Sequence, residues 1–297
     1  MEDLGKVFQH ACLVQLSTSC WQGSRMLDPA VMEQLGSSEW LKGRKHLVNP
    51  ETLNPIRAAI SRARKEIERN ALPFPIAGLT LVPKECLRST EAVLERHKRD
   101  YWEEVERFLE DYAEARETAK ESLGEHFNAA DYPVDIRGKF GFEWRYLAIE
   151  TPGKHSILTP EIYERERVKF EAMMEETREL AVAALRQEFA DHVSHMVERL
   201  TNDPEGKPKV FKASMIEKLR GYIASFEDRN LFADRQLESL VLQAKQIVGG
   251  TKAEHIREDP SLKRFIKNEM AQVKEAIDGA IADMPRRKIR FNQAEAA

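Results

Sequence analysis

The sequence has few of the features that define disulfide-rich, membrane-spanning or secreted proteins. Only three cysteines occur among 297 residues, and their odd number and irregular spacing argue against both a disulfide framework and a zinc site. No apolar run approaches the roughly 18 to 20 residues that a membrane helix requires. The N-terminal segment also lacks the basic region and the cleavage site of a secretory signal. We therefore expect a cytoplasmic protein that does not contact a membrane.

Recognisable catalytic signatures are missing as well. The sequence contains neither a G-x-x-x-x-G-K-[ST] phosphate loop nor a nucleophile elbow. Glu188, His192 and His195 fall on neighbouring faces of one expected helix, with the spacing of a metal half-site. No second Glu-x-x-His pair supplies the remaining ligands, and a packed or solvent-facing pair of histidines is the simpler interpretation. We therefore expect no metal at these three residues, no cofactor and no enzyme activity.

Charged residues are abundant and unevenly distributed. They make up 32% of the chain, against 42% hydrophobic residues, a balance that favours long solvated helices. The formal net charge of −4 conceals an acidic segment at 85–127, with 13 acidic and 7 basic residues. Residues 1–84 have the opposite bias, with 11 basic and 8 acidic residues. This pattern describes surfaces and not the fold.

Two long amphipathic helices are the main structural prediction. Apolar residues recur with alternating spacings of three and four over 85–127 and again over 159–200, the pattern of a helix packed along its length against another helix. The simplest arrangement is an antiparallel, coiled-coil-like hairpin of these two helices, although the same pattern suits a seam shared between subunits. The packing seam comprises Leu94, Tyr101, Val105, Phe108 and Tyr112 on the first helix and Phe170, Met173 and Leu180 on the second.

Helix starts are marked by a capping residue followed by proline, whose missing N–H costs nothing in the first turn of a helix. Three segments read as strands: residues 11–21, residues 72–82, and residues 140–149, where aromatic residues occupy every second position. Such an aromatic strand either belongs to a core or stacks nucleobases. The four cap and proline pairs are Asp28-Pro29, Asn54-Pro55, Thr159-Pro160 and Asp259-Pro260.

The predicted fold is mainly α with a minor antiparallel β-sheet, which places the protein in the α+β class. We expect an N-terminal α/β part of the base at 1–84, and the long hairpin at 85–200 with a strand segment at 128–158. A C-terminal helical bundle should follow at 201–285, and a basic tail at 286–297.

A cluster of basic residues near one helix is the best electrostatic candidate for binding. Seven cations between residues 42 and 65 face a single acid, Glu51. They could hold phosphates, or they could meet an acidic protein surface, including that of a neighbouring subunit. A solvated helix face needs neither partner. These residues are Lys42, Arg44, Lys45, Arg57, Arg62, Arg64 and Lys65.

Several local patterns together resemble a known but uncharacterised family. They are the early strand at 16–21, the two Asn-Pro pairs at 49–55 before a basic helix, the strand between Pro73 and Pro83, and Tyr101-Trp102 on the acidic helix. The family they resemble occurs in phages, integrative elements and bacterial chromosomes. Its members tend to be encoded beside a MoxR-like AAA+ ATPase and a von Willebrand factor A protein, an arrangement similar to the cobalt-chelatase subunits. The resemblance implies a role that depends on such a partner, and any nucleotide chemistry would belong to the partner.

These observations predict a non-enzymatic interaction protein. We expect an adaptor or substrate-recognition component of an AAA+ system, with an AAA+ ATPase, a von Willebrand factor A protein or both as partners. The alternative is a nucleic-acid-binding accessory protein of a phage or mobile element that uses the basic region from Lys42 to Lys65. A metal-dependent hydrolase centred on His192 and His195 is a third, more remote hypothesis. Assembly into a homo-oligomer is compatible with each of them.

Overall fold

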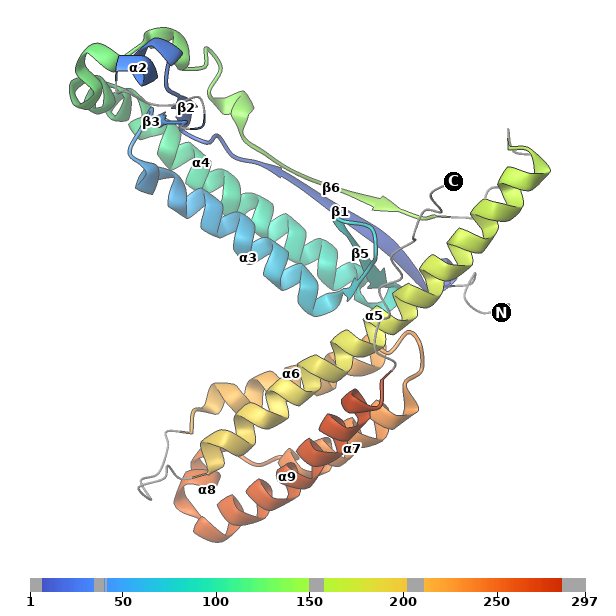
Figure 1. Ribbon diagram of the computed structural model, residues 1–297. Coiled ribbons are helices and arrows are strands. Elements are labelled where there is room, and N and C mark those ends of the chain that lie inside the picture. The colour runs from blue at the N-terminus through green and yellow to red at the C-terminus, as the bar shows by residue number, and fades with distance from the viewer. Residues whose placement is uncertain (1–6, 35–39, 41, 150–157, 202–210, 285–297) are drawn as a thin grey trace. The chain divides into compact units, whose positions relative to one another are not determined.

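The computed structural model describes residues 7–34, 40, 42–149, 158–201 and 211–284 (Figure 1). The chain divides into two compact units. We call residues 8–71 and 76–149 the sheet unit, and residues 1–7, 72–75 and 150–297 the bundle unit. Helices predominate and the main sheet is small and antiparallel, which confirms the predicted α+β class.

The sheet unit is built on a long central strand. Strand β1 (Ala11–Ser19) pairs on one side with β5 (Leu79–Pro83) and on the other with β6 (Gly141–Leu147), both antiparallel. Val14 lies opposite Thr80 in β5 and Tyr146 in β6. The three predicted strand segments therefore do meet in one sheet. A second, two-stranded ribbon of β2 (Ser24–Met26) and β3 (Arg44–His46) was not predicted, because each strand has only three residues.

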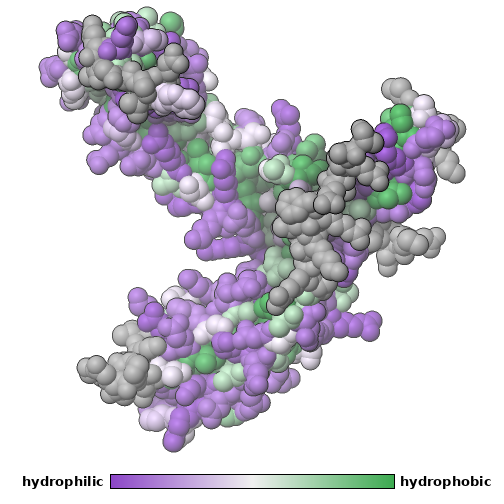
Figure 2. Space-filling model, viewed as in Figure 1, coloured by the Kyte–Doolittle hydropathy of each residue, from purple (hydrophilic) through white to green (hydrophobic). Residues whose placement is uncertain are grey.

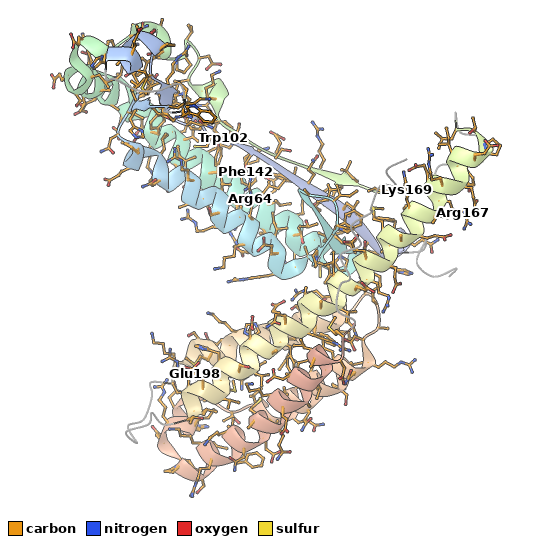
Figure 3. All side chains as sticks on the ribbon, in the orientation of Figure 1. Arg64, Trp102, Phe142, Arg167, Lys169 and Glu198 are labelled. Carbon is orange, nitrogen blue, oxygen red and sulfur yellow. The ribbon has the colours of Figure 1, made fainter. Side chains whose placement is uncertain are left out.

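Two helices cover one face of this sheet. Helix α3 (Asn54–Asn70) and the much longer α4 (Leu87–Leu123) lie side by side and pack against the strands (Figure 1). Side chains of alternate β1 residues enter the same core as the apolar face of each helix. Trp102 of α4 and Phe142 of β6 mark this core between helix and sheet (Figure 3). The buried face of α3 consists of Ile56, Ala59, Ala63 and Ile67.

Short elements complete the sheet unit. Among the described residues they are the helices α1 (Val7–His10), whose first residue belongs to the bundle unit, and α2 (Pro29–Gln34), with five 3-10 turns. The 3-10 turns span Pro50–Leu53, Lys84–Cys86, Gly124–His126, Ala129–Asp131 and Arg137–Lys139.

The bundle unit is an assembly of helices around α5 (Pro160–Leu200). Helix α5 packs against α9 (Pro260–Ala282) and α6 (Ala213–Arg229), and the short strand β4 (Leu72–Pro73) also contacts it. Helix α7 (Arg235–Val248) packs on α9, and the short α8 (Ala253–Glu258) fills the space between α6 and α9. The predicted C-terminal set of helices is present. The predicted basic tail at 286–297 lies outside the described residues.

A helix begins at each of the four predicted positions, and the predicted capping side chain acts at three of them. Asp28, Thr159 and Asp259 each accept a hydrogen bond from a backbone N–H in the first turn of α2, α5 and α9, respectively. Asn54 does not cap α3, because the preceding 3-10 turn already places it in helical conformation. The side chain of Asn49 caps that turn instead, by accepting from the N–H of Glu51 at 3.0 Å.

The predicted hairpin of the two long helices is wrong. Helix α4 packs on α3 and the sheet, whereas α5 packs on α6 and α9, so residues 85–200 do not form one structural unit. The seam residues of α4 are nevertheless correct: Leu94, Tyr101, Val105 and Phe108 are buried, and Tyr112 is half-buried. On α5 the predicted Phe170, Met173 and Leu180 are only half-buried. The buried face comprises Met174, Thr177, Ala181, Leu185 and Phe189, and the last four also belong to the apolar pattern predicted over 159–200.

Candidate functional site

Four of the seven predicted basic residues bind their own chain. Lys45 is largely buried, with its Nζ 2.6 Å from Asp131 Oδ2 and 2.7 Å from the carbonyl oxygen of His126. Arg44 donates to Gln22 Oε1 and Ser24 Oγ, both at 3.0 Å. On α3, Arg57 and Arg64 lie two turns apart. Arg57 donates to the carbonyl of Gln22, just after β1, and Arg64 donates to the hydroxyl of Thr18, within β1. These four cations hold segments of the sheet unit together, and Figure 3 labels Arg64 among them.

The remaining cations of this region face away from the core. Arg62 and Lys65 occupy the exposed side of α3, and Arg69 continues the same side one turn later. Among the described residues none of the three has a hydrogen-bond or ion-pair partner. Hydrophilic side chains dominate the surface over α3 (Figure 2). We call Arg62, Lys65 and Arg69 the cationic strip; Lys42 is also exposed, but it lies outside this helix.

The weak metal candidates are arranged as a structural pair. Glu188 Oε2 lies 2.6 Å from Nη2 of Arg229, a buried cation that also stacks on the ring of Tyr222. His192 Nε2 is 3.9 Å from Glu188 Oε1, and burial lowers the pKa of His192. His195 is exposed. The guanidinium of Arg229 already pairs with the carboxylate of Glu188, so a metal ion would be repelled there. The described part of the chain also holds no group of three or more potential metal ligands.

The alternating aromatic strand belongs to the core of the sheet unit. Phe142 is fully buried and Phe140 nearly so, with ring contacts to Tyr101 and Phe108 respectively. Trp144 Nε1 donates to a carboxylate oxygen of Glu91 at 3.0 Å, so its indole is held against α4. Of the two interpretations of this strand, the structure therefore favours core packing over stacking of nucleobases.

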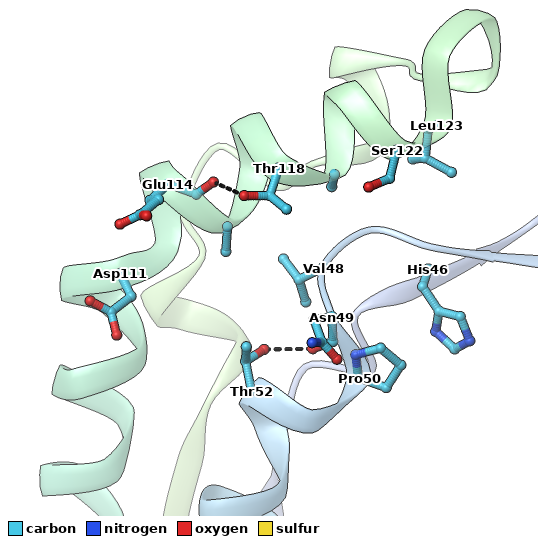
Figure 4. A pocket seen from close by; sticks show the side chains of 12 residues that line it. His46, Val48, Asn49, Pro50, Thr52, Asp111, Glu114, Thr118, Ser122 and Leu123 are labelled. Carbon is cyan, nitrogen blue, oxygen red and sulfur yellow. Dashed lines mark hydrogen bonds between the residues drawn. The ribbon is translucent and has the colours of Figure 1, made fainter.

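A groove lies between the C-terminal third of α4 and the segment that precedes α3 (Figure 4). Its volume is about 770 Å³. Val48, Ala115 and Ala119 form an apolar floor, with Leu123 and Pro50 at its margins. Hydroxyl groups and carboxylates stand on the rim: Thr52, Thr118, Ser122, Asp111 and Glu114. His46 and Asn49 complete the lining.

Local hydrogen bonds fix one wall of this groove. Asn49 caps the 3-10 turn, and its carbonyl oxygen accepts from Thr52 Oγ1 at 2.7 Å. The carbonyl oxygen of Leu47 accepts from the hydroxyl of Tyr132, a buried residue, at 2.8 Å. The opposite wall is α4, where the small side chains at 115, 118, 119 and 122 leave space beside the helix backbone. The groove is thus a preformed feature of the sheet unit.

The electrostatic character of the groove is acidic. Between Glu103 and Glu125 the sequence has nine acidic residues and three basic ones. The basic residues are engaged locally: Arg107 pairs with Glu104, Lys120 pairs with Glu117, and Arg116 stacks on the ring of Tyr132. Asp111 and Glu114 are exposed on the rim, and their carboxylates have no side-chain partner among the described residues. An apolar floor beside two unpaired carboxylates suits a cationic segment with aliphatic side chains.

The sequence analysis did not identify this groove, although it contained a signal. Residues 115–122 of the acidic helix carry alanine, threonine and serine at helical spacing, where the first two thirds of the helix carry tyrosine, phenylalanine and leucine. A change from large to small side chains along one face indicates that the covering element changes or ends there. The opposing wall, which lies more than 60 residues away in sequence, could not be placed without the fold.

This architecture defines an α+β domain with a preformed acidic groove, joined to a helical bundle. A family model described as a protein of unknown function (DUF3150) matches residues 8–210, and the chain belongs to that family. No curated protein and no solved structure matches the chain. No helix in the described part of the chain combines the length and the apolar character needed to cross a membrane.

Proposed function

We propose that this chain is a non-enzymatic interaction protein that serves as an adaptor or substrate-recognition component of an AAA+ ATPase system. The observation that carries the proposal is the groove, a concave surface with an apolar floor and two unpaired carboxylates. It offers a protein segment both apolar burial and charge complementarity. The AAA+ ATPase and von Willebrand factor A partners come from the family resemblance of the sequence, and family membership adds no activity of its own.

The packing of the polar groups supports an interaction role over catalysis. The buried polar contacts of the bundle unit include ion pairs and helix caps. Arg186, for example, donates to Asp234 at 2.7 Å and to the carbonyl of Ala280 at 2.6 Å. A catalytic acid or base requires a titratable group that faces a substrate cavity. The titratable groups that line the groove, His46, Asp111 and Glu114, are all exposed. On such an open rim the main effect of the two carboxylates is to attract cations.

Capture of partners by the purified full-length chain tests the proposal. The chain would be tagged, crosslinked in its host and purified after nuclease treatment, and the captured proteins would be identified by mass spectrometry. We expect a protein with AAA+ nucleotide-binding motifs or a von Willebrand factor A domain. Capture should fall at least tenfold in two groove variants, Asp111→Asn with Glu114→Gln, and Thr118→Trp, which fills the groove from an exposed position.

A matched control separates the groove from net charge. Glu85→Gln with Glu95→Gln removes the same two negative charges from exposed positions outside the groove. This variant should capture the partner as well as the wild type does. Equal capture by the groove variants and the wild type would show that the groove is not the docking surface.

The cationic strip favours a second candidate function, binding to nucleic acid. Arg62, Lys65 and Arg69 present three unpaired cations along about ten ångströms of helix, a spacing that can follow a phosphate backbone. Anisotropy of a labelled DNA or RNA duplex measures this directly. If the strip binds phosphates, affinity should fall steeply with salt, and Arg62→Glu with Lys65→Glu should abolish it. An affinity that does not change with salt concentration, or an absence of binding, would count against this function.

A further inference from the structure

The two ends of the α3 and α4 pair carry opposite charge. The two helices run antiparallel, because Glu66 near the end of α3 binds Arg96 and His97 near the start of α4. The groove therefore lies where α3 begins and α4 ends, whereas the cationic strip occupies the last half of α3. From Thr52 to Lys65 the chain rises about 20 Å at 1.5 Å per residue. Within one copy, a rigid helix keeps the strip away from the groove.

Both surfaces have unpaired charges at matching spacing. Arg62 and Lys65 are three residues apart on α3, and Asp111 and Glu114 are three residues apart on α4. Side chains at this spacing on a helix lie about 5 to 6 Å apart. Two cations of one helix can therefore face two carboxylates of another at the same time. Within the described chain, all four charged groups lack a partner.

The groove can also accept the stems of the cationic side chains. Arginine and lysine bury their methylene groups on apolar surface while their charged heads stay at a polar rim. The floor of Val48, Ala115 and Ala119 provides that apolar surface directly beside the carboxylates. Near the strip, α3 also carries the exposed Ser61 and the half-buried Ala58, small residues that allow the helix to approach closely, and the exposed acid Glu68.

We propose that the groove takes helix α3 of a second copy of this chain, with the cationic strip placed on Asp111 and Glu114. The inference rests on the proposed function in one respect, since it uses the same groove as a docking surface. The contact joins two different surfaces, so a pair of copies keeps one free strip on the first copy and one free groove on the second. Such head-to-tail contacts close into a ring or extend as a filament. Self-assembly also competes with any other partner for the groove.

Sedimentation of the full-length chain tests the assembly. At about 0.05 M salt the average mass should rise above the 34.2 kDa of one chain as the protein concentration increases from about 10 µM to about 1 mM. At about 0.5 M salt it should return to 34.2 kDa, because the contact depends on exposed charges. A mass of one chain at every concentration in low salt would overturn the inference.

Two neutralised variants make the test specific. The strip variant carries Arg62→Gln, Lys65→Gln and Arg69→Gln, and the groove variant carries Asp111→Asn and Glu114→Gln. Each should remain a single chain, and an equimolar mixture should form a complex of two chains and nothing larger, because only one intact groove and one intact strip remain per pair. The control variant Glu85→Gln with Glu95→Gln should assemble like the wild type. All substituted residues are exposed, and circular dichroism will confirm that each variant keeps its helicity.

The outcomes also separate this inference from the proposed function. The strip variant keeps an intact groove, so it should still capture the external partner. If that capture persists while the wild type never assembles, the occupant of the groove is another protein and this inference alone fails. If a mixture of the strip and groove variants stays monomeric, the two surfaces are not complementary and the inference is likewise overturned. Partner capture by the groove variant, in contrast, would contradict the proposed function alone.

Discussion

The hydroxyl of Tyr101 joins two strands, and its removal should destabilise the sheet unit. Tyr101 is fully buried; its hydroxyl donates to the carbonyl of Ser19 at 2.6 Å and accepts from the N–H of Gly141 at 3.0 Å. Ser19 ends β1 and Gly141 begins β6, where the two strands pair. Tyr101→Phe keeps the ring and leaves both backbone groups without this partner. Since an unsatisfied buried polar group costs about 1 to 3 kcal/mol, we expect a loss of about 2 kcal/mol.

Tryptophan fluorescence measures this loss selectively. All four tryptophans of the chain, at positions 21, 40, 102 and 144, belong to the sheet unit. For a unit of this size, about 2 kcal/mol corresponds to a fall of roughly 5 to 10 °C in the midpoint of thermal unfolding. The matched control is Tyr146→Phe, which also loses a hydroxyl, but from a side chain that is 41% exposed. Equal midpoints for the two variants would refute the reasoning.

The same residue predicts a dependence on alkaline pH. Burial raises the pKa of Tyr101 from 10.0 to about 12 in the folded chain. The neutral phenol is therefore favoured in the folded state, and its contribution is fully present below pH 10. It is lost as the pH rises toward about 12, where the unfolded chain is already ionised. Between these values the wild type should lose stability faster than Tyr101→Phe, and parallel losses would contradict the assignment.

Three further perturbations test the two cores. Phe108→Glu buries a charge beside α3 and the sheet, and should cost more than about 3 kcal/mol in tryptophan-monitored unfolding; an unchanged midpoint would contradict this packing. Arg229→Met leaves Glu188 without its cation and should cost about 3 kcal/mol in the bundle unit, measured by helical circular dichroism; Glu188→Gln in the same chain should recover part of that loss. The hydrogen bond from Arg96 lowers the pKa of Glu66, so this pair stabilises the fold above pH 4.5, and the contribution disappears as the pH falls through the lower folded value. The difference in stability between wild type and Glu66→Gln should therefore shrink in acid, and a constant difference would exclude the ion pair as its cause.

The sequence predicted which residues of the long helices are buried more reliably than which elements they pack against. A heptad pattern establishes that a helix has a buried stripe, and Leu94, Tyr101, Val105 and Phe108 are indeed buried. The heptad pattern carries no information on whether the stripe packs against a helix or against a sheet. On α4 the cover is α3 together with the aromatic side chains of β6, and the large rings of Tyr101 and Phe108 pack on Phe142 and Phe140. The hairpin followed from pairing the two most obvious stripes, which in fact belong to different cores.

The basic region shows a second limit of sequence reasoning. Seven cations close together in sequence predicted a single binding surface, but Lys45, Arg57 and Arg64 reach groups of the same chain. Their partners lie 35 to 86 residues away, so no local pattern could have revealed them. Only the exposed side of α3 retains the predicted character, and it gains Arg69, which the sequence analysis had not included. A cluster of charges in sequence therefore sets an upper limit on the charges available to a partner.

The construction of the groove determines how it should bind. Its wall at 47–53 is held by the cap of Asn49 and by the hydroxyl of Tyr132, and its floor includes the buried Val48. The conformational entropy of ordering these groups is therefore lost when the chain folds and not when a partner binds. A partner helix needs to order only its own cationic side chains. Binding should consequently proceed without rearrangement of the sheet unit, with the rim charges of Asp111 and Glu114 acting mainly on the rate of association. A surface of this kind favours rapid association, which would serve the proposed adaptor role.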